Sequence, residues 1–435
     1  MDKSAKILKR LELLHPKKID LSLYRLERLL KKLNNPHLKI SPTIHVAGTN
    51  GKGSVTSFLR SIFEAAKFKV NTYTSPHLIR FNERIRVNSK LINNHDLNLI
   101  LEECEYFNNG DPITFFEITT AAAFLIFSRV NSDITILETG LGGKYDATNV
   151  IKNKICSVLT PISMDHMNFL GTSIRRIALE KIGILKDTEI AVLSKQRKEV
   201  RELVRKETRK KKIELYEEGI DWKVINKDYK NNKFEIKYDK SRFGFQYPSL
   251  EGNHQIENAS TAIATVLSLK NNSISNKIIN KGLISAYWPA RMQLLKEGKL
   301  SKIIGKKFEL WLDGGHNLDA ARIIKTKIQS WKQEEVIIIM GMMNGKSPVS
   351  FLRRIMADIS MLFLLPIANQ NYIQPYEIKN KIRSRLKSKI EIHCSLDINE
   401  ALRTIKKRYS SGKIVVCGSL YLAGQILRED GFIIR

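Results

Sequence analysis

Apolar residues along this chain fall into short continuous runs that alternate with longer segments of helical periodicity. Residues 43–48 form the first such run, which predicts a buried strand, and in residues 52–67 apolar positions recur every three or four residues, which predicts a helix. Further strands are predicted at residues 70–74, 133–138, 155–161 and 190–194, and further helices at residues 115–130 and 174–185. This alternation predicts a doubly wound parallel sheet with helices on both faces.

The alternation is interrupted once and then resumes. Residues 221–247 combine apolar positions with polar turns in a way that is typical of a small antiparallel sheet, and helices follow at residues 254–270 and 275–286. After the segment WPAR, five more strands are predicted at residues 308–313, 335–340, 361–365, 390–393 and 413–416. We therefore predict a large N-terminal α/β domain of the P-loop type, residues 1–287, and a smaller Rossmann-like α/β domain, residues 288–435.

The composition and the N-terminal segment argue against a membrane-spanning or secreted protein. The longest apolar runs, such as residues 361–365, are too short to span a bilayer, so we expect no membrane association. The N-terminal segment MDKSAKILKRLELL is charged and lacks the apolar core and cleavage site of a secretory signal. The four cysteines include no CxxC pair, which favours a reduced, cytoplasmic protein.

The chain carries 73 Lys and Arg against 44 Asp and Glu, a formal net charge of +29. Such a surplus attracts anions, and a basic NTP-dependent nucleic-acid-binding protein is one alternative that it leaves open. That class predicts basic and aromatic residues clustered on one face. Here the basic residues are dispersed without interleaved aromatics, and the densest cluster, residues 205–212, is predicted on a solvated helix end. We therefore expect small anionic substrates and no nucleic acid.

The stretch HVAGTNGKGS, residues 45–54, joins the first predicted strand to the first helix. It differs from the usual P-loop pattern, because Val46 replaces the first glycine and Gly53 separates Lys52 from Ser54. Backbone N–H groups at a helix N-terminus nevertheless bind phosphate, and a lysine and a hydroxyl at these positions suit the outer phosphates and magnesium. We predict a phosphate-binding loop formed by Gly48, Thr49, Asn50, Gly51, Lys52, Gly53 and Ser54.

Two further side chains follow predicted strands. Glu138 ends a buried strand, where ligands gather in a doubly wound sheet, and its carboxylate could hold magnesium through oxygen; a helix-capping acid is the alternative. His166 follows the next strand, and from its position alone a buried core histidine is equally compatible. Lys181, on a predicted helix, would by itself pass as a surface lysine.

The loop resembles the variant of the Mur-ligase superfamily and, within it, of the folylpolyglutamate synthase/dihydrofolate synthase family. Further similar motifs follow in family order: SPHLIRFNERIRVN (75–88), TFFEITTAAAF (114–124), ETGLGGKYDATN (138–149), MDHMNFLG (164–171), EKIGILK (180–186), GNHQIENA (252–259), PARMQ (289–293) and DGGHNLDA (313–320). Two of them depart from the commoner spelling, since DGGHNLD replaces DGAHNPD and PARMQ replaces an ending of the GR-x-E type. The resemblance covers residues 45–320, and beyond them only the strand and helix pattern remains.

The resemblance implies an assignment for each matched position. The metal ligands would be Ser75, Glu138 and His166, holding one magnesium ion or two. Lys181 matches a lysine that is carbamylated in the family, so its positive charge would become negative. Lys52, Lys181 and His166 would be the catalytic residues. Besides the loop, the ATP contacts would be Asn258, Arg291, Asp313 and His316.

The resemblance also implies the reaction, an ATP-dependent carboxylate–amine ligation through an acyl phosphate that L-glutamate then attacks. The acyl substrate would be dihydropteroate, a reduced folate or both. The segment KYDATN, residues 144–149, is similar to the version found with dihydropteroate activity, although Lys144 and Tyr145 replace the commoner Arg and Leu, and this favours a bifunctional enzyme of folate biosynthesis. The substrate site would include Thr114, Tyr145, Asp146 and Ala147, and we expect a monomer.

A peptidoglycan-precursor ligase of the same superfamily is the second alternative. It would share the loop and the activation chemistry, but such ligases normally carry an additional N-terminal substrate domain. The present chain reaches its loop by residue 48, which leaves no room for that domain.

Overall fold

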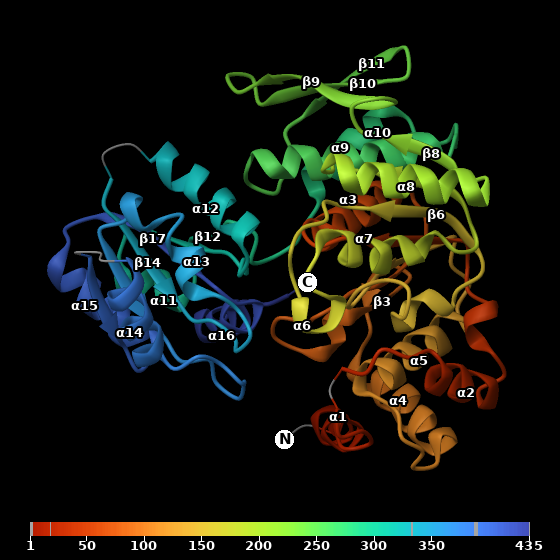
Figure 1. The fold of residues 1–435 in the computed structure, drawn as a ribbon, viewed down its shortest axis with the longest axis horizontal. Coiled ribbons are helices and arrows are strands. Elements are labelled where there is room, and N and C mark those ends of the chain that lie inside the picture. Colours follow the sequence, from red (N-terminus) through yellow and green to blue (C-terminus); the bar gives the residue numbers. More distant parts are fainter. Residues whose placement is uncertain (1–2, 18, 332–333, 387–389, 435) are drawn as a thin grey trace. The chain divides into compact units, whose positions relative to one another are not determined.

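A computed structural model describes residues 3–17, 19–331, 334–386 and 390–434, and the chain divides into two compact units. The first unit comprises Met1–Pro76, Phe81–Ser249 and Gln255–Tyr287, and the second comprises His77–Arg80, Leu250–His254 and Trp288–Arg435. Two short segments from the first 287 residues thus belong to the second unit. Figure 1 shows a separate sheet with its own helices in each unit.

The first unit is built on an eight-stranded sheet with the order β4-β3-β2-β5-β1-β6-β7-β8. Pairing is parallel from β2 to β8, whereas β3 and β4 form an antiparallel edge, and the doubly wound parallel sheet predicted from the sequence is confirmed. The central strands β1 and β5 are buried at every residue, as expected for strands covered on both faces. The strands are β1 (Thr43–Ala47), β2 (Val70–Tyr73), β3 (Ile85–Val87), β4 (Lys90–Leu91), β5 (Ile134–Glu138), β6 (Lys154–Leu159), β7 (Thr188–Leu193) and β8 (Glu214–Glu217).

Helices cover this sheet. One apolar core joins residues of α1, α2, α4 and α5 with β2 and β5, and another joins α7 and α8 with β6 and β7. The larger helices are α1 (Lys3–Glu12), α2 (Tyr24–Lys32), α3 (Lys52–Ala65), α4 (Asn94–Asn108), α5 (Phe115–Phe127), α7 (Ile174–Ile182), α8 (Lys198–Lys211), α9 (Asn253–Ser268) and α10 (Asn276–Ser285). The shorter ones are α6 (Met167–Leu170) and the 3-10 helices η1 (Pro36–Leu38), η2 (Phe81–Arg84), η3 (Ala147–Val150) and η4 (Gly183–Leu185).

Several details differ from the sequence prediction, and helices α2 and α4 were not predicted. The helix predicted at residues 174–185 ends at Ile182 and continues as η4, because Gly183 lies against the backbone of Lys144, whose Cα would be 2.5 Å from an added Cβ. The short strands β3, β4 and β8 were not predicted, since runs of two to four residues with exposed polar positions carry little periodicity. The small antiparallel sheet is confirmed: β9 (Trp222–Asp228), β10 (Lys233–Tyr238) and β11 (Ser241–Gln246) pair in the order β11-β10-β9, and β11 packs against α10 (Figure 1).

The second unit contains a six-stranded sheet with the order β12-β13-β17-β14-β15-β16, parallel except for the edge strand β12. Its strands are β12 (Gln293–Leu295), β13 (Phe308–Leu312), β14 (Val336–Met340), β15 (Met361–Leu364), β16 (Glu391–Cys394) and β17 (Gly412–Cys417), of which only the three-residue β12 was not predicted. The core on one face includes residues of α11 (Lys299–Ile304), α15 (Ile398–Arg408) and α16 (Leu420–Asp430). The other includes residues of α12 (Leu318–Ser330), α13 (Pro348–Leu352) and α14 (Pro375–Leu386).

Across the described ranges, the helices are all too short or too polar to pass through a bilayer.

Candidate active site

The loop between β1 and α3 is held in place by its neighbours. A Cβ on Gly48 would lie 1.9 Å from the Oγ1 of Thr160, and a Cβ on Gly51 would lie 2.5 Å from the Oδ1 of Asn258. Gly51 also has a φ of 88°, a conformation that favours glycine. Gly48 and Gly51 are therefore required by close packing against the end of β6 and against α9.

The first turn of α3 has no side-chain cap. Gly51 occupies the N-cap position and supplies no side-chain acceptor, so the N–H groups of the first turn receive none from it. The Nζ of Lys52 lies over the loop and donates to the carbonyl oxygens of Gly48 at 3.2 Å and Thr49 at 3.4 Å. A helix N-terminus with a lysine above it is suited to bind phosphate.

The predicted metal ligands follow adjacent strands. In the sheet, β5 lies between β2 and β1, and Glu138 of β5 is in register with Val46 of β1. Because parallel strands end at the same edge, Ser75 after β2, Glu138 at the end of β5 and the loop after β1 share that edge. The side chain of Glu138 is buried there. The strand order also reverses here, since the chain passes from β5 on one side of β1 to β6 on the other.

The segment after β6 is hydrogen-bonded to the loop and leads to His166. The Oγ1 of Thr49 donates to the carbonyl of Ser163 at 3.1 Å, and the Nδ2 of Asn50 donates to the Oγ of Ser163 at 3.1 Å. His166 begins α6 with a φ of 50°, and its backbone N–H donates to Asp165 at 2.8 Å. Its ring is 42% exposed, so the interpretation as a buried core histidine is wrong.

Histidine, cysteine and acidic side chains do not gather in groups of three or more in the part of the chain that the structure describes. The predicted ligand set contains only two such side chains, those of Glu138 and His166, together with the hydroxyl of Ser75. Magnesium usually binds to one or two carboxylates and keeps water and substrate phosphates as its other ligands. A sparse protein ligand set beside a phosphate-binding loop therefore fits magnesium.

Lys181 is buried, so the interpretation as a surface lysine is wrong. Its Nζ donates to the carbonyl oxygen of Gly48 at 2.7 Å. Burial and, second, the positive charge of Lys52 lower the pKa of Lys181 to about 7, although Asp165, Asp146 and Glu180 oppose the shift. About half of an amine with this pKa is neutral at pH 7, and the neutral form is able to react as a nucleophile.

The segment that follows Glu138 packs tightly against the end of α7. The backbone N–H of Lys144 donates to the carbonyl of Glu180 at 2.7 Å, and the Nδ2 of Asn149 donates to the carbonyls of Lys144 and Gly183, each at 3.2 Å. The Nζ of Lys154 donates to Asn149 at 2.9 Å and to the carbonyl of Ile184 at 3.0 Å. These bonds fix the segment KYDATN to the helix that carries Lys181.

Three of the predicted substrate residues, Tyr145, Asp146 and Ala147, belong to this segment. Thr114 is the N-cap of α5, and the first turn of α5 packs against the turn after Glu138, since a Cβ on Gly140 would lie 2.5 Å from the Cζ of Phe116. Asp146 and Ala147 are buried, whereas Tyr145 is 40% exposed, with the Nζ of Lys144 4.8 Å from its ring centroid.

In the second unit, the three predicted nucleotide contacts lie at the end of β13. The carboxylate of Asp313 accepts from the N–H groups of Met292 at 2.8 Å and Gly315 at 2.7 Å. His316 Nδ1 is 3.2 Å from the carbonyl of Gly314 and must carry the proton, because a carbonyl only accepts. The Nη1 of Arg291 donates to the carbonyl of Ala290 at 2.9 Å and lies 3.0 Å from where a Cβ on Gly314 would be.

Comparison with known proteins shows the family of the chain. The sequence model of the Mur ligase middle domain matches residues 46–266, and that of the dihydrofolate synthetase C-terminal domain matches residues 296–429. A dihydrofolate synthase/folylpolyglutamate synthase of Bacillus subtilis is 31% identical over 429 residues, which cover 93% of this chain and 94% of the relative. The chain belongs to the dihydrofolate synthase/folylpolyglutamate synthase family. It is an ATP-dependent ligase of the Mur type.

Solved structures of this family have the same fold over nearly the whole chain. Escherichia coli FolC, in complex with DHPP and ADP, superposes with a TM-score of 0.86 at 26% identity, covering 98% of this chain and 97% of that one. A bifunctional folylpolyglutamate synthase/dihydrofolate synthase with Mn, AMPPNP and L-glutamate bound superposes with a TM-score of 0.83 at 25% identity, covering 98% of each chain.

Sequence reasoning missed a buried hydrogen-bond chain in this family member. The Oγ1 of Thr148 donates to Asp146 at 2.5 Å and lies 2.8 Å from the Nε2 of His45. Because the hydroxyl proton goes to the carboxylate, His45 must donate through Nε2, and burial keeps it neutral by lowering its pKa well below the ordinary value. Burial raises the pKa of Asp146, while bonds from Thr148 and Leu141 oppose this. The available signal was a histidine within a strand that the sequence predicts to be buried.

Substitution of Thr148 by valine is expected to lower the free energy of unfolding by about 1–3 kcal/mol, because His45 and Asp146 each lose a buried partner. Thermal or urea unfolding would measure the loss. Thr148→Ser, which keeps the hydroxyl, is the matched control and should retain most of the stability. Equal stability of the valine and wild-type proteins would contradict the hydrogen-bond chain.

Proposed function

We propose that this protein joins L-glutamate to dihydropteroate, to the glutamate tail of reduced folates, or to both, using ATP. The observation that carries the proposal is the arrangement around Gly48, whose carbonyl oxygen accepts hydrogen bonds from Lys52 and from the buried Lys181. The glutamate ligand and the nucleotides bound to the solved relatives support the same reaction.

The loop residues 48–54 and Asn258 would hold the triphosphate of ATP in the first unit. Arg291, Asp313 and His316 of the second unit are the other proposed ATP contacts. Since the carboxylate of Asp313 already accepts two backbone N–H groups, its part would be to shape the loop that carries His316. Ser75, Glu138 and His166 would hold magnesium, one ion or two. When bound, magnesium neutralises charge on the phosphate oxygens.

In the proposed reaction, a carboxylate oxygen of the acyl substrate attacks the γ-phosphorus of ATP, and ADP leaves. The glutamate nitrogen then attacks the acyl carbon, the bond to the phosphate oxygen breaks, and the nitrogen loses a proton as the amide forms. Lys52 and the first-turn amides of α3 would stabilise the negative charge on the transferred phosphoryl group. Holding the acyl phosphate and the amine together would supply most of the remaining rate enhancement.

Thr114, Tyr145, Asp146 and Ala147 would form the acyl-substrate site, and the segment KYDATN favours dihydropteroate as one of the substrates. Incubation of the protein with ATP, magnesium, labelled glutamate and either dihydropteroate or tetrahydrofolate tests this directly. We expect label in the products of both acyl substrates. Label in neither product would overturn the proposal, and label only with tetrahydrofolate would overturn bifunctionality. We further propose a cytoplasmic monomer that acts without nucleic acid or membrane.

Lys181 would act as a carbamate. Its buried position beside Gly48 and its amine pKa of about 7 both support this modification, because carbon dioxide reacts with the neutral amine.

A further inference from the structure

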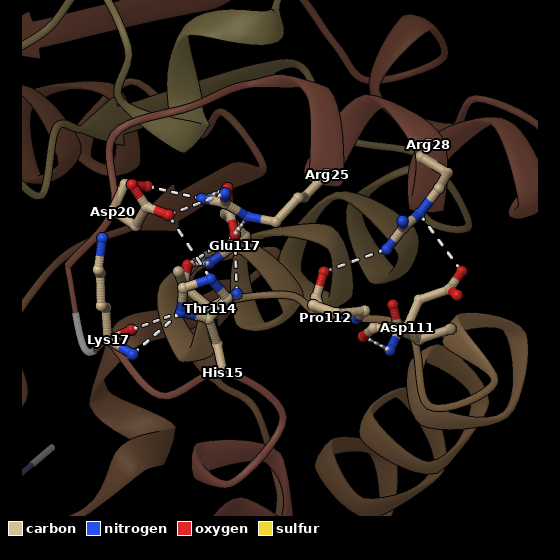
Figure 2. Close-up of polar contacts among 10 residues, drawn as sticks. His15, Lys17, Asp20, Arg25, Arg28, Asp111, Pro112, Thr114 and Glu117 are labelled. Carbon is tan, nitrogen blue, oxygen red and sulfur yellow. Dashed lines mark hydrogen bonds and ion pairs between the residues drawn. The ribbon is translucent and has the colours of Figure 1, made fainter.

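Arg25 of α2 connects the N-terminal part of the chain to the beginning of α5. Figure 2 shows its guanidinium group between Asp20 and Glu117. The Nε and Nη2 atoms donate to the two carboxylate oxygens of Glu117, each at 3.0 Å. The side chains are 15% and 4% exposed, so this is a buried, two-point ion pair between residues 92 positions apart.

The same carboxylate holds Thr114. Oε2 of Glu117 accepts from the backbone N–H and from the Oγ1 of Thr114, each at 2.8 Å, while the N–H of Glu117 donates back to Oγ1 at 3.3 Å. This is a capping box, but one whose acid is charged and buried, so it depends on Arg25 for its counter-charge. The hydroxyl proton of Thr114 is committed to Glu117. Toward a ligand, Thr114 can therefore only accept a hydrogen bond.

Arg25 also fixes the segment that precedes α2. Its Nη1 donates to the Oδ2 of Asp20 at 3.1 Å, and its Nη2 donates to the carbonyl of Asp20 at 2.7 Å. The Nε2 of His15 lies 3.5 Å from the same carboxylate, and the Nδ1 of His15 lies 3.0 Å from the carbonyl oxygen and 3.1 Å from the backbone nitrogen of Lys17 (Figure 2). One guanidinium group thus links this segment to Glu117, the carboxylate that holds Thr114.

An ion pair between α1 and α4 has no such link to Thr114. Arg10 of α1 forms a two-point pair with Glu105 of α4 at 3.0 and 2.6 Å, but these side chains are 54% and 27% exposed. Neither residue belongs to the hydrogen-bond network of Thr114. The pair therefore offers a matched comparison: the same chemistry and a similar structural connection, without a link to the substrate residue.

We propose that Arg25 is a positioning residue for the acyl substrate, which acts by holding the Glu117 carboxylate that orients Thr114 as a hydrogen-bond acceptor. The inference rests on the proposed function, in which Thr114 faces that substrate. Such an acceptor recognises an N–H donor, which in dihydropteroate would be an N–H group of the pterin ring. Arg25 takes no part in binding ATP in this scheme.

The test is a comparison of KM values in full-length variants. We expect Arg25→Met to raise KM for dihydropteroate roughly 10-fold while KM for ATP stays unchanged, by analogy with residues that orient direct ligands. Arg25→Lys keeps the charge but not the two-point geometry, so its KM for dihydropteroate should lie between those of the wild type and of Arg25→Met. Glu117→Gln, which keeps the shape, should reproduce the defect, and Arg10→Met should leave both KM values unchanged.

Thermal unfolding of each variant separates positioning from folding. If Arg25→Met and Glu117→Gln lower Tm but leave KM for dihydropteroate unchanged, the proposal is overturned, and it is equally overturned if Arg10→Met raises that KM as much. Should Arg25→Met fail to fold, Arg25→Lys and Glu117→Gln provide the same comparison. A wild-type protein that ligates glutamate to neither acyl substrate would instead overturn the proposed function, a result visible before any variant is made.

Discussion

Replacement of Lys52 by methionine is expected to lower kcat for glutamate ligation by about 10²–10³-fold, the usual cost of removing one preorganised donor from a transition state. The ammonium group of Lys52 lies over the loop at the N-terminus of α3, 3.2 Å from the carbonyl oxygen of Gly48. Methionine keeps most of the length and apolar volume of the side chain, so the fold should persist. Initial rates of ADP formation with saturating acyl substrate and glutamate measure the effect.

The control for this variant is Lys67→Met, which removes a positive charge just beyond the other end of α3. If the loss of rate in Lys52→Met comes from the missing local stabilisation of phosphate, and not from the lower overall positive charge, Lys67→Met should leave kcat unchanged. The Lys52→Met substitution should also affect Lys181. The charge of Lys52 helps to lower the pKa of Lys181, so its removal should raise that pKa. Full ligation activity of Lys52→Met would rule out the central role of the loop.

The elements that carry the site were predictable because their signals are local. The apolar run before Gly48 and the helical periodicity after Lys52 lie within neighbouring residues, and the position of Glu138 at a strand end follows from the same kind of pattern. In a parallel sheet, those local assignments already place the strand ends at one edge. Lys181 could have been recognised as buried, since it lies four residues after Ile177 and three after Ala178, on the apolar face of α7.

The remaining features depend on residues that are far apart in the sequence. Arg25 and Glu117 meet only because α2 packs against α5, and His45 meets Thr148 only because the fold brings η3 next to β1. A polar residue on a helix does not reveal whether it faces water or a partner. Neither does periodicity reveal that His77–Arg80, within a motif of the first 287 residues, packs with the C-terminal unit. Such pairings are set by tertiary packing, for which single-sequence patterns hold no direct signal.

Replacement of Lys181 by methionine is expected to lower kcat by about 100-fold, a loss typical of residues that support metal ligands. If the amine of Lys181 attacks carbon dioxide and loses a proton, the resulting carbamate places a negative charge beside the loop. The pKa of about 7 makes this feasible, because an ordinary lysine with a pKa of 10.5 is neutral in only about one molecule in 10³ near pH 7.5. Activity should fall when carbon dioxide is removed and return when bicarbonate is added, and intact mass under native conditions should show one added carbon dioxide.

The lowered pKa of Lys181 also determines whether the folded protein gains or loses stability as pH rises. The folded-state pKa of Lys181 lies below the unfolded value, so the unfolded protein binds more protons between pH about 7 and 10.5. The unmodified wild type should therefore gain stability relative to Lys181→Met as pH rises through this window, by at most about 1.4 kcal/mol per pH unit. Lys186→Met, which alters an exposed lysine next to η4, should change neither activity nor this pH dependence. Wild-type activity in Lys181→Met, or activity indifferent to carbon dioxide, would exclude the carbamate.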